Sequence, residues 1–511
     1  MKKIYPKEWL ELHPYKQTDS VDLYYTGIAN KIYAYLSTSA ISESYDDDKN
    51  LRYTSLCLAS WFEDVISQTG IWQAFTAECL KRYGSYLPFY PLNGDYYPDE
   101  INQEDVRFLL WHHTQYFRNR DIIVNPENPG IELAAYNIYN ILADEYETAP
   151  ENERMQHFLL YSDIGKEDFP LYRIVLEWFH YSCYFNIENM DQFMDETDNM
   201  LDAEEITEEK TDIMTYGIQT TLMLQGRWGP LSLTSPEWLA RITQKIPERR
   251  LWTDVEVRKS SCFLLTGEDD DFLYLKDLCK EDDKTLNVLK RSLNMAAVRN
   301  REIGESILIC ELVHYGDCWW QCGLLLENKM DEKLQSYIDE QTKKDGKPNE
   351  RAAFKDFMKA SGGRFFIFCR NKDEIIDFFT NKMGYQTMEG VELPPINVSS
   401  GAILMAGPQS GLHIQYKLCE CIKSSDNPFY NQEKAEEEAI SFIANPNVIP
   451  YELSCILQDK EMLPDASLKS LKGKKHAKEF IHKNAQFLTD YFHHQCREKD
   501  FDAIMAIRGE K

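Results

Sequence analysis

Residues 102–117, NQEDVRFLLWHHTQYF, set the pattern for the first half of this chain. The side chain of Asn102 can accept a hydrogen bond from a free backbone N–H at a helix start, and Glu104 and Asp105 suit the positive end of the helix dipole. Apolar and ring side chains then recur every three or four residues, at Val106, Leu109, Leu110, His113 and Phe117. This spacing predicts an amphipathic helix.

The same spacing recurs at residues 51–67, 131–147, 171–186 and 211–225. Loops with Pro or Gly separate these segments, so we predict a domain of antiparallel helices over residues 1–250. The loop at 86–98, YLPFYPLNGDYYP, carries three prolines and five Tyr or Phe rings. We expect this loop to be ordered and to cover a helix end, and a ligand-binding aromatic loop is the alternative.

The pattern changes from helical to strand-like between residues 226 and 251. Two hairpins are predicted, one from 261–265 and 272–275, the other from 307–314 and 318–326. Short strands are expected at 364–369, 402–406 and 412–418, and helices at 373–382, 432–444, 450–458 and 474–506. We therefore predict an α+β fold, with a mostly helical half followed by a mixed strand-and-helix domain over 251–511. Residues 330–360 are predicted to form a charged helical excursion.

Length and composition limit the class of protein. A chain of 511 residues is too long for one core, and 43% hydrophobic residues are ample for folding. The 84 acidic and 56 basic residues give a net charge of −28, which disfavours nucleic acid and anionic lipid as partners. Neither a secretory signal nor a membrane span is expected. The 13 cysteines lie mostly in apolar settings, typical of reduced core thiols, so we expect a cytoplasmic protein.

Two stretches depart from the average charge. Residues 188–212 are crowded with Asp and Glu, and a solvated helix or loop is expected there. Residues 469–483 are basic, with Lys472, Lys474, Lys475 and Lys478 between two further lysines. We interpret this stretch as the solvated face of a helix, and an anion-binding patch is the alternative.

Two patterns suggest metal ligands. Glu177 and His180 are three residues apart on a predicted helix, as in carboxylate-bridged di-iron bundles, but such a site needs a second copy of the motif, which the chain lacks. We therefore expect a buried pair that hydrogen-bonds to itself. A second set is Cys310, His314, Cys318 and Cys322. In a hairpin His314 would face Cys318 and Cys310 would face Cys322, with about 13 Å between the pairs, which is too far for one zinc ion.

Two motifs of known enzyme classes, the nucleophile elbow and the phosphate loop, are also incomplete in this chain. In residues 401–411, GAILMAGPQSG, the serine is one place late for a nucleophile elbow, and Pro408 and Gln409 stand where a phosphate loop needs Lys and Ser or Thr. We expect no cofactor.

Several strings resemble a Bacteroidetes-type family of bacterial proteins called domain of unknown function thirty-eight forty-three. They are WLELHPY at 9–15, EDVRFLLWHH at 104–113, and GLHIQYKLCECIK and NPFYN between 411 and 431. The resemblance spans most of the chain. It implies no activity, cofactor or catalytic residue.

Two main hypotheses follow for function. The first is a non-catalytic cytoplasmic protein-interaction or accessory protein, since every catalytic motif is incomplete. The alternative is a hydrolase or metal-dependent enzyme whose site assembles from residues remote in sequence. Its candidates are Glu63, Asp64, Glu145 and Glu177, with His180 as ligand or base. A third hypothesis makes 469–483 an anion or nucleic-acid contact.

Overall fold

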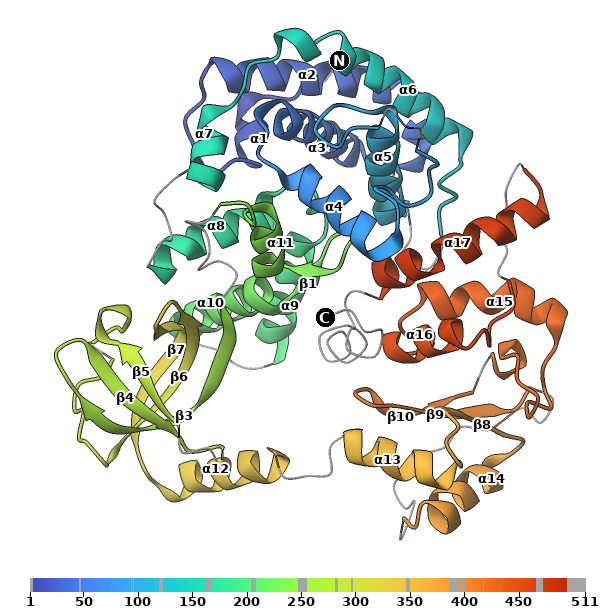
Figure 1. The fold of residues 1–511 in the computed structure, drawn as a ribbon. Coiled ribbons are helices and arrows are strands. Elements are labelled where there is room, and N and C mark those ends of the chain that lie inside the picture. Colours follow the sequence, from blue (N-terminus) through green and yellow to red (C-terminus); the bar gives the residue numbers. More distant parts are fainter. Residues whose placement is uncertain are drawn as a thin grey trace.

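The arrangement of the chain is shown in Figure 1, a computed structural model in which four parts follow one another in a circuit. Helices of the first half lie at the top, a barrel at the lower left and a small sheet at the lower right, and the last helix returns to the first part. The structure describes residues 3–45, 47–92, 94, 96–118, 123–161, 168–203, 208–246, 255–280, 284–295, 297–345, 350–385, 396, 400–416, 418–465 and 472–493.

The first half of the chain is helical, as predicted. Its helices are α1 (Pro6–Leu10), α2 (Ser20–Leu36), α3 (Asp48–Ser67), α4 (Ile71–Tyr83), α5 (Gln103–Arg118), α6 (Pro129–Ala143), α7 (Glu153–Gln156), α8 (Phe169–Ser182), α9 (Asn189–Ala203), α10 (Glu208–Gln225) and α11 (Ser235–Ile242). The five predicted helices correspond to α3, α5, α6, α8 and α10. A short ribbon, β1 (Arg227–Trp228) and β2 (Leu233–Thr234), precedes α11.

Helices α2 and α4 were not among those predicted. The carboxylate of Asp19 accepts hydrogen bonds from the N–H groups of Val21 and Asp22, and the carboxylate of Asp22 accepts one from Asp19 N–H, so two side chains close the start of α2. Helix α4 begins after Gly70, which has a φ of +88°. The start of α2 is thus set by capping side chains and the start of α4 by a glycine turn. Neither start shows as a change in apolar spacing, which is the pattern used for the prediction.

The start of α5 differs from the prediction in one respect. Instead of accepting a backbone hydrogen bond, the amide of Asn102 donates to Tyr97 O, to Glu100 O and to Asp105 Oδ2. The carboxyl of Asp105 also accepts a hydrogen bond from Tyr96 Oη at 2.9 Å and is fully buried. Burial raises the pKa of Asp105 to about 8, because the charged form is poorly solvated there.

The strands of the second half begin with a closed barrel. Its strands are β3 (Glu256–Glu268), β4 (Phe272–Asp277), β5 (Thr285–Leu289), β6 (Ser306–Tyr315) and β7 (Cys318–Lys329), in the order β3-β4-β5-β7-β6. Neighbours are antiparallel except β5 and β7, which are parallel. This is the strand order of the OB-fold, a five-stranded Greek-key barrel. Both predicted hairpins are confirmed as β3–β4 and β6–β7.

The register of the second hairpin corrects the prediction. Tyr315 pairs with Cys318, so the turn has two residues, and His314 faces Trp319 rather than Cys318. Gly316 takes a φ of +67°, as tight two-residue hairpin turns require. A bulge between Cys310 and Leu312 places Cys310 opposite Leu325, not Cys322.

A small sheet follows two helices in the region predicted as a charged excursion. These helices are α12 (Glu332–Asp345) and α13 (Glu350–Ala360), and residues 346–349 between them lie outside the described residues. The sheet has the order β10-β9-β8, from β8 (Phe366–Cys369), β9 (Ala402–Gly407) and β10 (Gly411–Gln415). Helices α13 and α14 (Lys372–Asp377) lie on one side of the sheet, and α15 (Gln432–Ala444) and α16 (Tyr451–Asp459) on the other (Figure 1).

The last helix, α17 (Lys474–Phe492), packs against the helices of the first half (Figure 1). The ring of Phe89, from the aromatic loop at 86–98, stacks on Phe480 with 5.7 Å between centroids, and Phe89 N–H donates to Asn484 Oδ1 at 3.0 Å. Tyr83 Oη donates to Asp490 Oδ2 at 2.6 Å. The aromatic loop therefore packs down as predicted, and α17 shares the core of the helical part. The division into domains at residue 250 remains a prediction.

Two properties of the described residues bear on the environment of the protein. None of the helices that the structure describes is long and apolar enough to cross a membrane. The cysteines within the described ranges are thiols, and all of them except Cys318 are buried.

Candidate functional site

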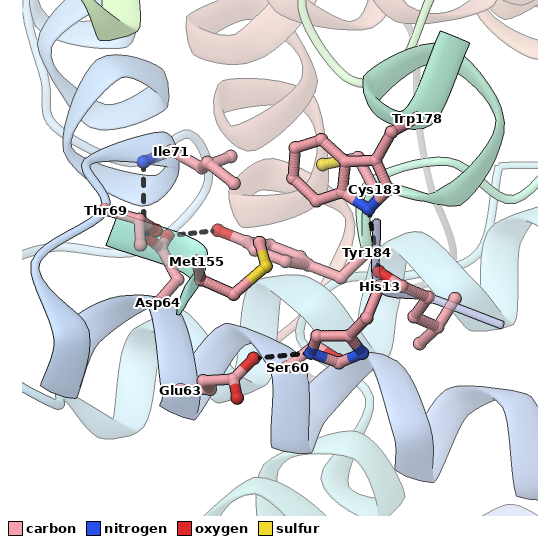
Figure 2. Close-up of a pocket in the computed structure, with 11 residues that line it drawn as sticks. His13, Ser60, Glu63, Asp64, Thr69, Ile71, Met155, Trp178, Cys183 and Tyr184 are labelled. Carbon is pink, nitrogen blue, oxygen red and sulfur yellow. Dashed lines mark hydrogen bonds and ion pairs between the residues drawn. The ribbon is translucent and has the colours of Figure 1, made fainter. Parts of the chain in front are cut away.

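A small pocket lies among the helices of the first half (Figure 2). Its free space is about 20 Å³, room for about one water molecule. It is lined by the chain after α1, one face of α3, the turn into α4, α7, α8 and the chain after α8, through Leu12, His13, Ser60, Glu63, Asp64, Thr69, Ile71, Met155, Trp178, Cys183 and Tyr184. The volume suits a bound water and is too small for a metabolite.

His13 and Glu63 form a buried ion pair at this pocket (Figure 2). His13 Nε2 lies 2.8 Å from Glu63 Oε2, and Nδ1 lies 2.8 Å from Trp9 O. Because both ring nitrogens face oxygen acceptors, the ring satisfies both only when it carries two protons. Burial alone would lower the pKa of His13, but the charge of Glu63 and the hydrogen bond to it outweigh burial, so the pKa lies above its usual value.

The ion pair continues into a wider polar network. Asn152 Nδ2 donates to Glu63 Oε1 at 2.8 Å and lies 2.7 Å from Tyr15 Oη, whose hydroxyl donates to Asp22 Oδ1 at 3.1 Å. Arg154 ends the network with a 2.5 Å ion pair to Asp22 Oδ2. Arg154 also pairs with Asp19 at 2.9 Å. Three acidic and two basic side chains thus lie in one network, which ties the chain around α1 and α2 to α3 and α7.

Asp64 occupies the opposite wall of the pocket (Figure 2). Its carboxyl accepts hydrogen bonds from the Thr69 hydroxyl, from the N–H groups that begin α4, Ile71 at 3.2 Å and Trp72 at 2.8 Å, and from Tyr184 Oη at 2.7 Å. Burial raises the pKa of Asp64 although these four donors counteract it. The side chain therefore caps α4 from the preceding helix and holds Tyr184 in place.

The pocket contains two side chains that could act as nucleophiles, Ser60 and Cys183. Ser60 Oγ is buried and has no hydrogen-bond partner within the described parts of the chain. A serine nucleophile needs a base to take its proton, and both nitrogens of His13 are engaged elsewhere. Burial raises the pKa of the Cys183 thiol, which disfavours the reactive thiolate. The arrangement therefore lacks an activated nucleophile among these residues.

Comparison with known proteins gives a family for the chain. Residues 3–304 and 306–494 match the family model described as Protein of unknown function (DUF3843). The chain belongs to this family. The resemblance drawn from the sequence strings is thereby confirmed. The same comparisons found no match among curated proteins or among solved structures.

The structure brings together only some of the residues predicted for this DUF3843 protein. Glu63 and Asp64 line the pocket. Glu145 lies elsewhere, where it pairs with Lys31 and accepts a hydrogen bond from Tyr24 Oη at 2.8 Å. The hydrogen bond from Lys31 lowers the pKa of Glu145. His13 was missed by the sequence reasoning because its acidic partner is 50 residues away.

The predicted pairing of Glu177 with His180 is wrong. Glu177 is exposed on α8 and accepts a hydrogen bond from Gln219 Nε2 at 3.2 Å, whereas His180 is buried and lies 2.9 Å from Ser235 Oγ. Trp228 Nε1 donates to the same hydroxyl. Burial lowers the pKa of His180 to about 3, which keeps the ring neutral. Helical spacing put the two residues on neighbouring positions, but only one of them faces the core.

The second metal pattern is also dispersed. Cys310 belongs to the interior of the barrel, and Cys322 packs with the helical core. Across the ranges that the structure describes, no three His, Cys, Asp or Glu side chains come close enough to hold a metal ion together.

The basic stretch at 469–483 is largely paired within the chain, over the part from Lys472 that the structure describes. Lys472 and His476 contact Glu127, and Lys474 and Lys478 contact Glu436. The hydrogen bond from Lys478 is the largest cause of a pKa of about 2 for Glu436. These contacts fasten α17 to α15 and to the chain before α6. Lys472, Lys474 and Lys475 remain mostly exposed, so the solvated face expected from the sequence is present and also forms ion pairs.

The turn between β9 and β10, where a phosphate loop was considered, is filled by a carboxylate of the chain itself. Glu452 Oε1 accepts hydrogen bonds from Ser410 N–H at 2.8 Å, from Gln409 N–H at 3.2 Å and from the Ser410 hydroxyl. Glu452 is buried. The backbone donors that could bind an external anion are therefore already satisfied.

Proposed function

We propose that this DUF3843 protein is a non-catalytic cytoplasmic protein that binds another protein through α9 and its neighbours. The observation that carries the proposal is the apolar stripe of α9. Met190, Phe193, Met194 and Leu201 follow helical spacing, yet no side chain between residues 190 and 201 is buried. An amphipathic helix of a globular protein normally turns such a stripe to the core.

The helices beside α9 carry further exposed apolar side chains. Helix α10 packs against both α8 and α9. Among the exposed large apolar side chains of the described residues, seven fall on these three helices: Leu171, Ile174, Met190, Met194, Leu201, Met214 and Tyr216. Single exposed apolar residues are ordinary, but their concentration on three helices in contact is typical of a protein-binding surface.

The pocket supports a non-catalytic role over the alternative of a hydrolase or metal-dependent enzyme. Of the acids considered for such a site, only Glu63 and Asp64 meet there, and both are held by donors of the protein. Both nitrogens of the His13 ring are already hydrogen-bonded within the protein. The free volume of the pocket is too small for a substrate beside Glu63 and Asp64. A network of this kind fits a structural task.

The charge of the barrel turns and the buried thiols support two further parts of the proposal, a partner other than nucleic acid and a cytoplasmic location. The outer face of β4 and β5, where OB-fold barrels bind oligonucleotides, is bordered by Glu268, Asp269, Asp270 and Asp271 at one turn and by Asp317 at another. Lys290 and Arg301 pair with Glu268, but the other carboxylates of these turns repel a phosphate backbone, which disfavours nucleic acid as a partner. Buried cysteine thiols suit a reducing cytoplasm.

Photo-crosslinking in the source cell tests the protein-binding role. A photoreactive residue at Met194 should give an adduct with one identified protein, recovered repeatedly by mass spectrometry. The matched control carries the same residue at Leu133, which is exposed on α6. An adduct at Met194 that is absent at Leu133 supports the proposal. Recovery of the protein without a partner from both positions contradicts it.

A further inference from the structure

The polar side of α9 carries charge of one sign. Residues 188–203 include six acidic residues and neither Lys nor Arg. Asp191, Asp195 and Asp198 are exposed on the helix, beside the stripe formed by Met190 and Met194. An apolar stripe edged by carboxylates is the complement of an apolar stripe edged by Lys or Arg.

The neighbouring helices extend this acidic border. Glu177 on α8 and Asp212 on α10 are exposed. The nearby basic side chain of Arg173 is buried, with its guanidinium 4.0 Å from the ring centroid of Tyr216 and its Nη1 2.8 Å from Thr220 Oγ1. Its charge is therefore directed to the protein and does not neutralise the surface of α9.

Methionine suits such a surface because its side chain is unbranched and adapts to different partners. The stripe runs from Met190 to Leu201, about 16 Å along a helix axis. A helical segment of about three turns matches this length. We infer that α9, together with the exposed apolar side chains of α8 and α10, binds a positively charged amphipathic helix of a partner protein. This inference rests on the proposed function and names the chemistry of the partner.

Other occupants fit the surface less well. A second copy of the chain would bring the same carboxylates face to face, which is unfavourable. An anionic membrane would repel α9 for the same reason. A positively charged helix gains from both the apolar stripe and its acidic border.

Peptide binding to the full-length protein tests the inference. The probe is a fluorescent peptide of about 18 residues, five helical turns, with Leu at helical spacing and Lys at the other positions. Two controls replace Lys by Glu or scramble the Leu positions. We expect the Lys peptide to bind at least about tenfold more tightly than either control, and its affinity to fall at high salt because exposed charges are screened.

Variants of the protein locate the binding site. Met190→Ser with Met194→Ser removes apolar contact, and Asp191→Asn, Asp195→Asn and Asp198→Asn together remove charge. Each set should weaken the Lys peptide at least about tenfold, or ~1.4 kcal/mol. Leu133→Ser, at an exposed apolar position on α6, is the matched control and should leave affinity unchanged. Because all these side chains are exposed, circular dichroism should show unchanged folding.

The outcomes separate this inference from the protein-binding role itself. Equal binding of the Lys and Glu peptides, no binding of either, or a loss that is the same in Leu133→Ser would overturn the inference. So would concentration-dependent dimerisation that disappears in the methionine variant. A crosslinked partner at Met194 whose attached segment is acidic would refute the inference and still leave the proposed function standing.

Discussion

Asn484, on the last helix, accepts a hydrogen bond from the backbone N–H of Phe89, 395 residues earlier in the chain. Phe89 has a φ of +72°, in the left-handed region that bulky residues rarely adopt. The contact therefore holds a strained residue of the aromatic loop and joins the end of the chain to its first half. Figure 1 shows this return of α17 to the helices at the top.

Asn484→Ala should destabilise the helical part of the protein. The substitution leaves the buried N–H of Phe89 without its acceptor, at a cost of about 1–3 kcal/mol. The urea midpoint followed by circular dichroism measures the change. Asn137→Ala is the matched control, since Asn137 also donates to the carbonyl four residues earlier but near the surface. Equal midpoints for the two variants would show that the contact with Phe89 contributes nothing.

The pair of His13 and Glu63 makes stability depend on pH. The folded-state pKa of His13 is raised, so its stabilising effect is complete below about pH 6.5 and is lost as the pH rises through the folded-state pKa. The contribution of His13 to the wild-type urea midpoint should therefore fall from about pH 6.5 upward, so the midpoint of His13→Gln should fall less above this pH.

His180→Gln is the control for this titration. The pKa of His180 is about 3 in the folded protein, and an unfolded histidine loses its proton around pH 6.5, so the ring is neutral in both states above about pH 7.5. The variant should keep the wild-type pH slope. A proton resonance of His13 that titrates below pH 6.5 would refute the raised pKa.

Asp105 should give a second pH dependence. Its folded-state pKa of about 8 lies far above that of an unfolded aspartate. Between about pH 5 and about pH 8 the unfolded chain is ionised and the folded carboxyl is not, so stability falls with rising pH by about 1.4 kcal/mol per pH unit. Asp105→Asn should remove this slope. Glu104→Gln, at the neighbouring position, should retain it, and an unchanged slope in Asp105→Asn would place the folded pKa near its ordinary value.

The sequence predicted those parts of the fold that depend on neighbours along the chain. The apolar spacing around Leu109 and Leu110 places α5 on the core because helical geometry alone brings these side chains to one face. The turn at Gly316 likewise predicts the β6–β7 hairpin. Its register differed because a turn of two residues and a bulge after Cys310 decide which residues pair.

The site depends on contacts that no local pattern contains. His13 meets Glu63 only after α1 folds back on α3, and Asn152 arrives from 89 residues beyond Glu63. The string WLELHPY contributed to the family resemblance, yet nothing in its spacing indicates a buried ion pair. Glu177 and His180 illustrate the reverse error, because three-residue spacing allows a contact but does not require that both side chains face inward.

The same Gly→Ala change should have opposite effects at two positions. A Cβ on Gly407 would lie 1.7 Å from Glu452 Oε1 and 2.3 Å from Ser410 Oγ. Glu452 is buried and held by the N–H groups of the turn, so it cannot move aside without leaving these donors unpaired. Gly407→Ala should therefore destabilise the small sheet by at least about 2 kcal/mol.

Gly27 provides the comparison, since it lies in α2 and a Cβ there meets no atom within 4 Å. Gly27→Ala should stabilise the protein by about 0.5–1 kcal/mol, because alanine loses less backbone freedom in a helix. Thermal unfolding of both variants measures the two changes in stability. If Gly407→Ala matched Gly27→Ala in sign, the carboxylate of Glu452 would not lie against the β9–β10 turn.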